Sequence, residues 1–313
     1  MSMGLHSGQL LPYLLAFGAS LTPLIPYLLW AYWRRGVHRA RPRPEKLLSG
    51  PGDSQRQLIA ELDWSIAAAT IWLVAIPVAA VGVLLAPNLA GVAPLARLDQ
   101  LAMAGLPLLL LLFPLFTLIS KCRERAACRL VLDGQLTAGR EINLLLREGF
   151  HVFHDVPAAS GNVDHVVVGL SGVFAVESLG RPIPEKGRGI IDAKVIYDGE
   201  NLFFPPKNAR ESEAIKQSRR QAIAMERRLS DALGRAIKVK AALALPGWFV
   251  EKKRPDDLVL LYGQASHYAR ILRGPTVLSP ERVSEIVRFL DALCRDIDPG
   301  ELLAEVAGAP SIE

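Results

Sequence analysis

Cysteine and histidine are scarce in this sequence. Its 313 residues include three cysteines and six histidines. Three cysteines are too few for the disulfide framework of a small secreted protein, and there is no Cys-x-x-Cys pair of the kind that builds zinc sites. The chain also has no phosphate-binding loop, dinucleotide fingerprint, kinase signature or serine nucleophile elbow. These absences exclude several common classes of enzyme.

Charge is missing from three long segments in the first 120 residues. Residues 10–33, 64–92 and 101–120 contain no Asp, Glu, Lys or Arg. About 20 helical residues cross a bilayer core that is about 30 Å thick, so each segment is long enough to span it. We therefore expect a membrane region over residues 1–129. Its three helices are predicted near 10–33, 64–90 and 101–120.

Basic residues flank these segments unevenly. Residues 34–46 hold six basic residues and one acidic residue, and residues 121–129 hold four basic residues and one acidic residue. By the positive-inside rule, the N-terminus lies outside and the C-terminal domain lies in the cytoplasm. The sequence thus predicts a multi-pass protein of the inner (cytoplasmic) membrane, with the lipid bilayer as a partner.

The formal net charge of +5 has its origin in these flanking segments. Residues 130–313 contain 24 basic and 25 acidic residues, which leaves that part of the chain close to neutral. The excess of positive charge therefore indicates membrane orientation and does not indicate binding to nucleic acid.

The residues after 130 predict one mixed α/β domain. Thr137 suits the N-cap of a helix, and Gly149 suits its C-terminal end. A short hairpin and a later strand–helix alternation favour a mixed sheet flanked by helices over a doubly wound parallel sheet. The predicted helices are 137–149, 209–234 and 279–295, and the predicted strands are 150–156, 163–169, 172–178, 190–196, 238–244 and 258–262. Residues 299–313 read as a loosely ordered tail.

Two acidic residues fall on predicted strands at positions that alternate with core valines. Asp164 lies near the start of one strand, and Glu177 lies at the end of the next. Burying such a side chain is unfavourable unless it binds a cation or accepts hydrogen bonds. The two carboxylates could converge on a hard cation such as Mg²⁺, with Glu141 as a third oxygen donor. The alternative is that both acids are solvated or cap a turn.

The order of several short motifs in this region resembles the NERD, or nuclease-related, domain. The motifs are FHVFHDV at 150–156, GNVDHVVVG at 161–169, GVFAVE at 172–177, QSRRQA at 217–222 and LPGWFV at 245–250. The likeness covers about residues 133–250. It implies a restriction-endonuclease-like domain at 130–250, with 251–313 as a C-terminal extension and tail.

The resemblance implies functional residues as well as a fold. The family is related to PD-(D/E)xK nucleases, which hydrolyse the phosphodiester bonds of DNA with Mg²⁺, for which Mn²⁺ can substitute. Glu141, Asp164 and Glu177 occupy its acidic positions, and Gln217 occupies the position of its helical glutamine. Asp164 and Glu177 would then be the metal ligands.

The sequence departs from the family pattern at one position. Glu-Thr-Lys is expected where the chain has Glu177-Ser178-Leu179, and leucine can neither carry charge nor donate a hydrogen bond. Arg181, Lys186 or Lys194 could replace the lysine. Two hypotheses therefore stay open: a membrane-anchored nuclease, or a catalytically degenerate module that binds nucleic acid or an unidentified protein partner.

Two basic segments leave further alternatives. The 209–234 helix carries five basic residues between Lys216 and Arg228, which could contact DNA or form an ordinary solvated helix face. The 34–46 segment could bind anionic lipid as part of a membrane-proximal scaffold, although its topological role explains it without further function.

Overall fold

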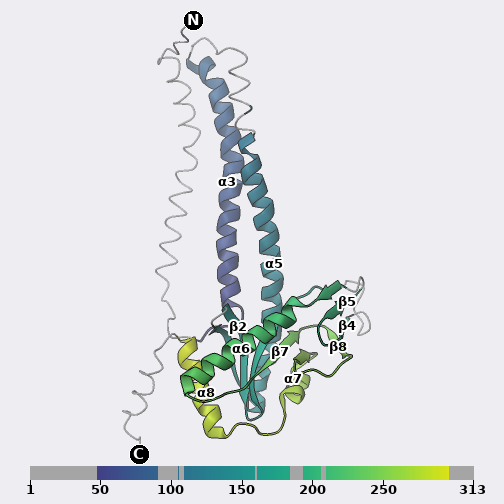
Figure 1. Cartoon of the computed structure of the whole chain (residues 1–313). Coiled ribbons are helices and arrows are strands. Elements are labelled where there is room, and N and C mark those ends of the chain that lie inside the picture. The colour runs from purple at the N-terminus through teal and green to yellow at the C-terminus, as the bar shows by residue number, and fades with distance from the viewer. Residues whose placement is uncertain are drawn as a thin grey trace, which may run out of the picture. The chain divides into compact units, whose positions relative to one another are not determined.

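The computed structural model of the chain describes residues 48–90, 105, 109–158, 161–183, 193–205 and 209–295 (Figure 1). The chain divides into two units. One unit is Met1–Arg43 with Ile59–Ala126, called the helical unit after its described residues, and the other is Pro44–Leu58 with Ala127–Glu313, called the α/β unit after its described residues. Each unit is described separately below.

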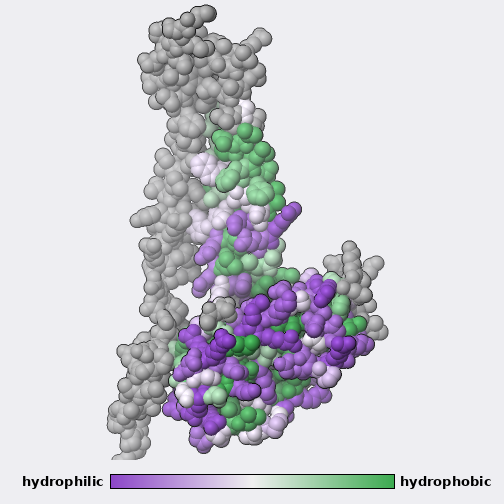
Figure 2. Space-filling view, viewed as in Figure 1, coloured by the Kyte–Doolittle hydropathy of each residue, from purple (hydrophilic) through white to green (hydrophobic). Residues whose placement is uncertain are grey.

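Two long helices supply the described part of the helical unit. Helix α3 spans Asp53–Ala90, and α5 spans Leu112–Asn143. Within the described residues, the Asp53–Gly82 part of α3 is the one helix that is long and apolar enough to cross a membrane. Figure 2 shows hydrophobic residues gathered over the upper part of α5. The exposed large apolar side chains there include Trp72, Val74, Val78, Val81, Leu85, Phe113, Leu115, Phe116 and Ile119.

The structure describes one candidate membrane helix where the sequence predicts three. The predicted 64–90 helix lies within α3. The predicted 10–33 helix lies outside the described residues, and the predicted 101–120 helix is described only at residue 105 and from residue 109 onward.

Helix α5 joins two segments that were predicted to be separate. It continues through the basic segment 121–129 and past Thr137, which was expected to begin a new helix. The Thr137 hydroxyl donates a hydrogen bond to the Asp133 carbonyl at 2.7 Å, one turn earlier in the same helix, and so it does not cap an N-terminus. The predicted end is confirmed: the 3-10 helix η1 (Leu144–Glu148) stops at Gly149, whose φ is 83°.

A five-stranded mixed sheet forms the centre of the α/β unit, in the order β1-β2-β3-β7-β9. Strands β1 (His151–Ala158), β2 (Gly161–Gly169) and β3 (Gly172–Ser178) are antiparallel neighbours. Strands β7 (Val239–Leu245) and β9 (Val259–Tyr262) continue the sheet in parallel with β3. All five strands match predicted ones to within two residues at each end.

Helices cover both faces of this sheet (Figure 1). Helices α6 (Glu213–Leu233) and α8 (Pro280–Cys294) pack on one face, over a core of β1–β3 valines that includes Val166 and Val173. The end of α5, η1 and α7 (Ala265–Leu272) pack on the other face. The expected mixed sheet flanked by helices is therefore confirmed.

A second, four-stranded sheet was not predicted as a unit. Its order is β6-β5-β4-β8, formed by β4 (Lys194–Tyr197), β5 (Leu202–Phe204), β6 (Ala209–Glu211) and β8 (Phe249–Lys252). Residues 209–211 were expected to be helical. They pair instead with β5, and a Glu211 carboxylate oxygen accepts the Glu213 backbone N–H at 2.9 Å, so α6 begins after them.

Close backbone contact brings α5 against the end of β3. A Cβ atom on Gly134 would lie 2.5 Å from the Gly180 Cα atom, which leaves room for glycine alone. This approach places the next residue of the helix, Gln135, beside β2.

Candidate functional site

Asp164 is a buried carboxylate near the start of β2. One of its oxygens accepts a hydrogen bond from the Gln135 amide at 2.6 Å, and the other accepts one from the Ser178 backbone N–H at 2.8 Å. Burial raises the pKa of Asp164 from 3.8 to about 7, against the opposing effect of these hydrogen bonds. Helix α5 and strand β3 therefore hold the carboxylate in a fixed orientation.

Glu177 lies on the neighbouring strand, next to Asp164. The β2–β3 register pairs His165 with Val176, and its continuation places Asp164 opposite Glu177. The Oε2 atom of Glu177 is buried and has no hydrogen-bond partner. Burial, followed by repulsion from Asp164, raises the pKa of Glu177 to about 8. Two carboxylates thus face one another with one oxygen left unsatisfied.

This pair fits the chemistry of a divalent-cation site. An orphaned buried carboxylate oxygen is unfavourable unless a cation or a donor meets it. Within the described residues, no group of three or more His, Cys, Asp and Glu side chains is arranged to hold a metal ion. A cation here would therefore take two carboxylates and complete its shell with water or substrate oxygens, as Mg²⁺ commonly does.

Glu141 lies elsewhere in the α/β unit and contacts α7. Its Oε2 atom accepts the Ala265 backbone N–H at 2.6 Å, which places the carboxylate at the first turn of α7. This satisfies an N–H group that the helix itself leaves free. The structure gives Glu141 a capping contact, and it brings only Asp164 and Glu177 together.

Gln217 lies on the part of α6 that crosses the end of β3. The Ser218 hydroxyl donates to the Ala242 carbonyl of β7 at 2.8 Å, and the Gln221 amide donates to the Asn162 carbonyl of β2 at 3.4 Å. Because β3 lies between β2 and β7, the turn from 217 to 221 passes over the strand that carries Glu177.

The Gln217 side chain binds an arginine on the next turn of α6. Its Oε1 atom accepts hydrogen bonds from Arg220 Nη2 at 2.9 Å and from Arg220 Nε at 3.3 Å. The Arg220 charge lowers the pKa of Glu177 and so opposes the effects of burial and of Asp164. Within the described residues, the side-chain hydrogen bonds of Gln217 are to Arg220, and none reaches Asp164 or Glu177.

Leu179 packs against an apolar cluster where the family pattern has lysine. Its side chain contacts a core that includes Leu243 and Trp248, and its backbone N–H donates to the Ala244 carbonyl at 2.9 Å. Among the described residues, no lysine forms an ion pair with Asp164 or Glu177.

The three suggested replacements for the lysine have other positions. The Arg181 guanidinium lies 3.5 Å from a Glu211 carboxylate oxygen and 4.3 Å from the centre of the Phe204 ring. Lys194 pairs with Glu251 at 2.5 Å. Lys186 lies outside the described residues.

A pair of histidines on the sheet face opposite Asp164 was not predicted from the sequence. His154 and His165 are register partners of β1 and β2, and their Nδ1 atoms lie 2.7 Å apart. The outer nitrogens contact Asn143 at 2.8 Å and the Ser178 hydroxyl at 3.1 Å. Burial lowers the pKa of His154 to about 4 and that of His165 well below its usual value, so both rings are neutral. The pairing of the two strands on either side of Ser160-Gly161-Asn162 was the available signal in the sequence.

Asp155 is a further polar residue beside the acid pair. It has a φ of 53°, which is rare for a residue other than glycine. Its carboxylate accepts the Ser54 backbone N–H at 2.7 Å and the Asn162 amide at 3.0 Å. The charge of Asp155 adds to the rise in the pKa of Asp164. These contacts join the first turn of α3 to the strands that carry the site.

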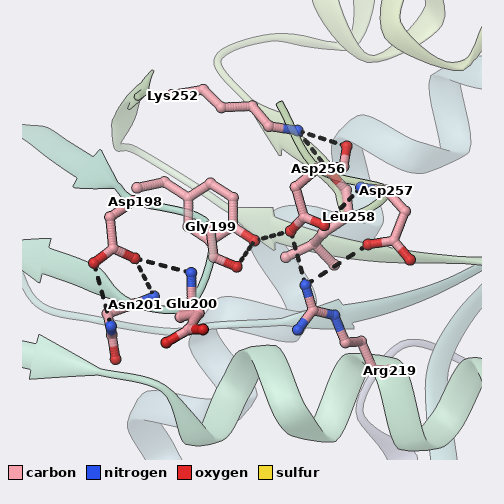
Figure 3. Close-up of polar contacts among 10 residues, drawn as sticks. Asp198, Gly199, Glu200, Asn201, Arg219, Lys252, Asp256, Asp257 and Leu258 are labelled. Atoms are coloured by element: carbon pink, nitrogen blue, oxygen red, sulfur yellow. Dashed lines mark hydrogen bonds and ion pairs between the residues drawn. The ribbon is translucent and has the colours of Figure 1, made fainter. Parts of the chain in front are cut away.

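A second acidic cluster lies against α6, in the loop between β8 and β9 (Figure 3). Arg219 Nη2 lies 2.8 Å from an Asp256 carboxylate oxygen and 3.6 Å from an Asp257 oxygen. The Tyr197 hydroxyl donates to Asp256, and Lys252 Nζ donates to the Asp256 carbonyl at 3.0 Å. Burial raises the pKa of Asp256, but hydrogen bonds from Asp257 and Tyr197 and the Arg219 charge lower it further, to about 2.

The basic side chains of α6 are largely engaged within the protein. Lys216 pairs with Glu213 at 2.8 Å, and Arg219 pairs with Asp256. Arg227 is exposed and Arg228 is half-buried. The helix face that was considered for DNA contact therefore carries less free charge than its composition indicates.

Comparison with known proteins supports one part of the chain. The family described as "Nuclease-related domain" matches residues 132–246, a span that includes Asp164, Glu177 and Gln217. The match covers less than half of the chain. No curated protein and no solved structure matches it. The similarity to the nuclease-related domain is thus confirmed for the region that runs from α5 to the end of β7.

Proposed function

We propose that the nuclease-related domain is a Mg²⁺-dependent phosphodiesterase that cleaves DNA, with Asp164 and Glu177 as cation ligands. The observation that carries this proposal is the buried, unpartnered Oε2 atom of Glu177 beside the Asp164 carboxylate. Mg²⁺ binds proteins through one or two carboxylates together with water and phosphate oxygens. Mn²⁺ accepts the same oxygen ligands and should substitute.

The hydrogen bonds around Asp164 leave its carboxylate able to bind a cation. When bound, a divalent cation polarises a phosphoryl oxygen and lowers the pKa of bound water. The Gln135 amide and the Ser178 N–H use one hydrogen bond on each oxygen of Asp164, which leaves a lone pair on each oxygen available. Hydrolysis adds the oxygen of water to phosphorus and breaks one P–O ester bond, and the departing oxygen takes up a proton.

A second candidate function is a catalytically degenerate module that binds nucleic acid or a protein partner. The observation that favours it is the packing of Leu179 against the apolar cluster, in the place of a cationic side chain. The loss of one electrostatic partner of a transition state typically lowers a rate by about 10²–10³-fold. The two candidate functions therefore share one fold and differ in the expected rate of DNA cleavage.

A cleavage assay separates the two candidates. The full-length chain, purified in detergent, is incubated with single- and double-stranded DNA and with Mg²⁺ or Mn²⁺. The wild type should cleave above the background of Asp164→Asn, and Leu179→Lys should cleave about 10-fold to 100-fold faster than the wild type. Cleavage by Leu179→Lys alone would favour the degenerate module, and cleavage by no variant would contradict the phosphodiesterase.

We also propose that the chain is a multi-pass inner-membrane protein with its N-terminus outside and its α/β unit in the cytoplasm. The apolar part of α3 and the basic residues at 121–129 support this topology. Cys122 is exposed and lies in that basic segment. In intact spheroplasts, a membrane-impermeant maleimide should leave Cys122 unlabelled and should label Ser7→Cys in a cysteine-free chain. The reverse pattern would contradict the orientation.

A further inference from the structure

A small cavity lies between the start of α8 and the turn that joins β2 to β3. Its volume is about 150 Å³, which is enough for one six-membered ring. Four segments line it: the β2–β3 turn, the α6–β7 connection with the start of β7, the loop before α8, and the first turns of α8. Gly172 begins β3 at this cavity, whereas Glu177 lies near the other end of the strand, roughly 16 Å further along it. The cavity is therefore separate from the acid pair.

Hydrogen bonds hold the walls of this cavity in place. The Ile237 backbone N–H, in the α6–β7 connection, donates to the Ser230 hydroxyl at 3.0 Å. The backbone N–H groups of Val277 and Leu278 both donate to the Leu170 carbonyl, at 2.8 and 3.0 Å. The segments that form the walls are thus fixed to α6 and to β2, and the cavity is preformed, as most small-molecule sites are.

The buried part of the lining is apolar. Ile237, Leu278 and Ile286 are buried, and they belong to the core that α6 and α8 form with the sheet. Apolar side chains of this kind favour an apolar or aromatic group of a ligand. The cavity has room for a single ring and is too small for the acyl chains of a phospholipid.

The exposed part of the lining is basic. Four basic side chains and one acidic side chain line the cavity, and the acidic one, Glu285, accepts hydrogen bonds from Arg235 Nη2 at 2.6 and 2.7 Å. The other three basic residues are Lys238, Lys240 and Arg282, and they form no ion pair within the described residues. Arg282 also lies in the first turn of α8, where the helix dipole favours an anion. Basic side chains that meet without carboxylate partners are suited to a phosphate group.

We propose that this cavity is a second binding site, which takes a nucleotide with its base inside the cavity and its phosphate against Lys238, Lys240 and Arg282. Lys240 Nζ donates to the Ser171 carbonyl at 3.4 Å, which leaves two of its three donors for a phosphate oxygen. The nucleotide is either a free mononucleotide or the terminal nucleotide of a DNA strand, since both present the same phosphate ester. The inference goes beyond the proposed phosphodiesterase, because the acid pair takes no part in it.

Equilibrium dialysis of the full-length chain with deoxyadenosine monophosphate tests the site. EDTA is present, so that no divalent cation can hold phosphate at the acid pair. Lys238→Ala and Arg282→Ala should each weaken binding by about 10-fold, because each removes a charged hydrogen-bond donor. Arg288→Ala, at an exposed position of the same helix and outside the cavity, is the matched control and should bind as the wild type does. Unchanged binding in both Lys238→Ala and Arg282→Ala would overturn the inference.

Two smaller probes test the two halves of the site. Deoxyadenosine and inorganic phosphate should each bind at least about 10-fold more weakly than the monophosphate, because linked groups bind more tightly than separate ones. Ala236→Leu, which narrows the cavity, should weaken binding of the monophosphate and leave that of inorganic phosphate unchanged. Equal affinities for the monophosphate and for either smaller probe would overturn the inference.

Asp164→Asn distinguishes this site from the proposed cleavage site. It should bind deoxyadenosine monophosphate as the wild type does, whether or not the wild type cleaves DNA. A loss of binding in Asp164→Asn would place the nucleotide at the acid pair and overturn the inference. A 5′-phosphorylated oligonucleotide that displaces the monophosphate would identify a DNA end as the source of the nucleotide, and failure to displace it would identify the free mononucleotide. Either of these two results supports the site.

Discussion

The two acidic pairs of the α/β unit have opposite environments. Asp256 and Asp257 lie beside Arg219, Tyr197 and Lys252, and the pKa of Asp256 falls to about 2. Asp164 and Glu177 lie inside the main sheet, and their pKa values rise to about 7 and about 8. Asp256 is ion-paired within the protein, whereas no ion pair to Asp164 or Glu177 forms among the described residues.

The difference distinguishes a carboxylate that the protein itself ion-pairs from a pair that we propose binds a cation. The Asp256 cluster links the second sheet to α6 and needs no ligand. Glu177 keeps an orphaned buried oxygen, which costs stability unless a cation binds. Strongly raised carboxyl pKa values at a buried pair are typical of functional sites. The predictions below test this contrast.

The largest expected effect is on cleavage. Glu177→Gln should lower the DNA-cleavage rate by at least about 10²-fold, because an amide is a poor ligand for Mg²⁺. Asp256→Asn, in the other pair, should change the rate by less than about threefold. Rates are measured under single-turnover conditions with saturating Mg²⁺. Equal losses in the two variants would show that the pairs do not differ in function.

The second-largest expected effect is on stability. Here the substitution at Asp256 should be more destabilising than the substitution at Glu177. Asp256→Ala should lower the free energy of unfolding by about 1–3 kcal/mol, because it removes charge-assisted hydrogen bonds to Arg219 and Tyr197. Glu177→Gln should leave the stability of the metal-free protein unchanged or raise it. Chemical denaturation in EDTA measures both. A larger loss in Glu177→Gln would contradict the contrast.

Asp256 should respond to pH in the opposite direction from Asp164 and Glu177. The folded pKa values of Asp164 and Glu177 exceed their usual values of 3.8 and 4.5, so the folded protein retains protons that the unfolded chain releases. The metal-free protein should therefore lose stability as the pH rises from about 4.5 to about 8. Asp256 has a lowered pKa, so its contribution is lost as the pH falls from about 4 to about 2.

The measurement for this prediction is the Tm in EDTA between pH 5 and pH 8.5. Glu177→Gln should flatten the decline, whereas Glu200→Gln, on an exposed turn, should leave it unchanged. An identical slope in the wild type and in Glu177→Gln would contradict the raised pKa of Glu177.

A smaller effect concerns the helix that positions Asp164. In Gly134→Ala the new Cβ atom would lie 2.5 Å from the Gly180 Cα atom, so α5 must shift and move the Gln135 amide. We expect a loss of about 1–3 kcal/mol in unfolding free energy and weaker cation binding. Gly105→Ala, where no atom lies within 4 Å of the added carbon, should change neither. Wild-type stability in Gly134→Ala would show that the close approach is not required.

The main sheet could be predicted because its signals are local. The strands that carry Asp164 and Glu177 are short runs of β-branched and aromatic residues, and Gly149 and Gly234 end helices in the left-handed conformation. The match at residues 132–246 confirms the family resemblance in this region. Both acids could therefore be placed on adjacent strands before the structure was known.

The remaining features depend on contacts between distant residues. Strand β6 forms because residues 209–211 pair with β5, which overrides their helical composition. The capping role of Glu141 needs α7, which lies 124 residues away in the chain. The position of α6 follows from its anchoring on β2 and β7. None of these leaves a pattern in a short segment of sequence.

Mn²⁺ binding to the full-length chain, followed by electron paramagnetic resonance, tests most directly whether the buried pair is a cation site. The wild type should bind Mn²⁺ in competition with Mg²⁺, Asp164→Asn and Glu177→Gln should each lose that binding, and Asp256→Asn should retain it. Equal binding by the wild type and by Glu177→Gln would contradict the assignment of Asp164 and Glu177 as the cation ligands.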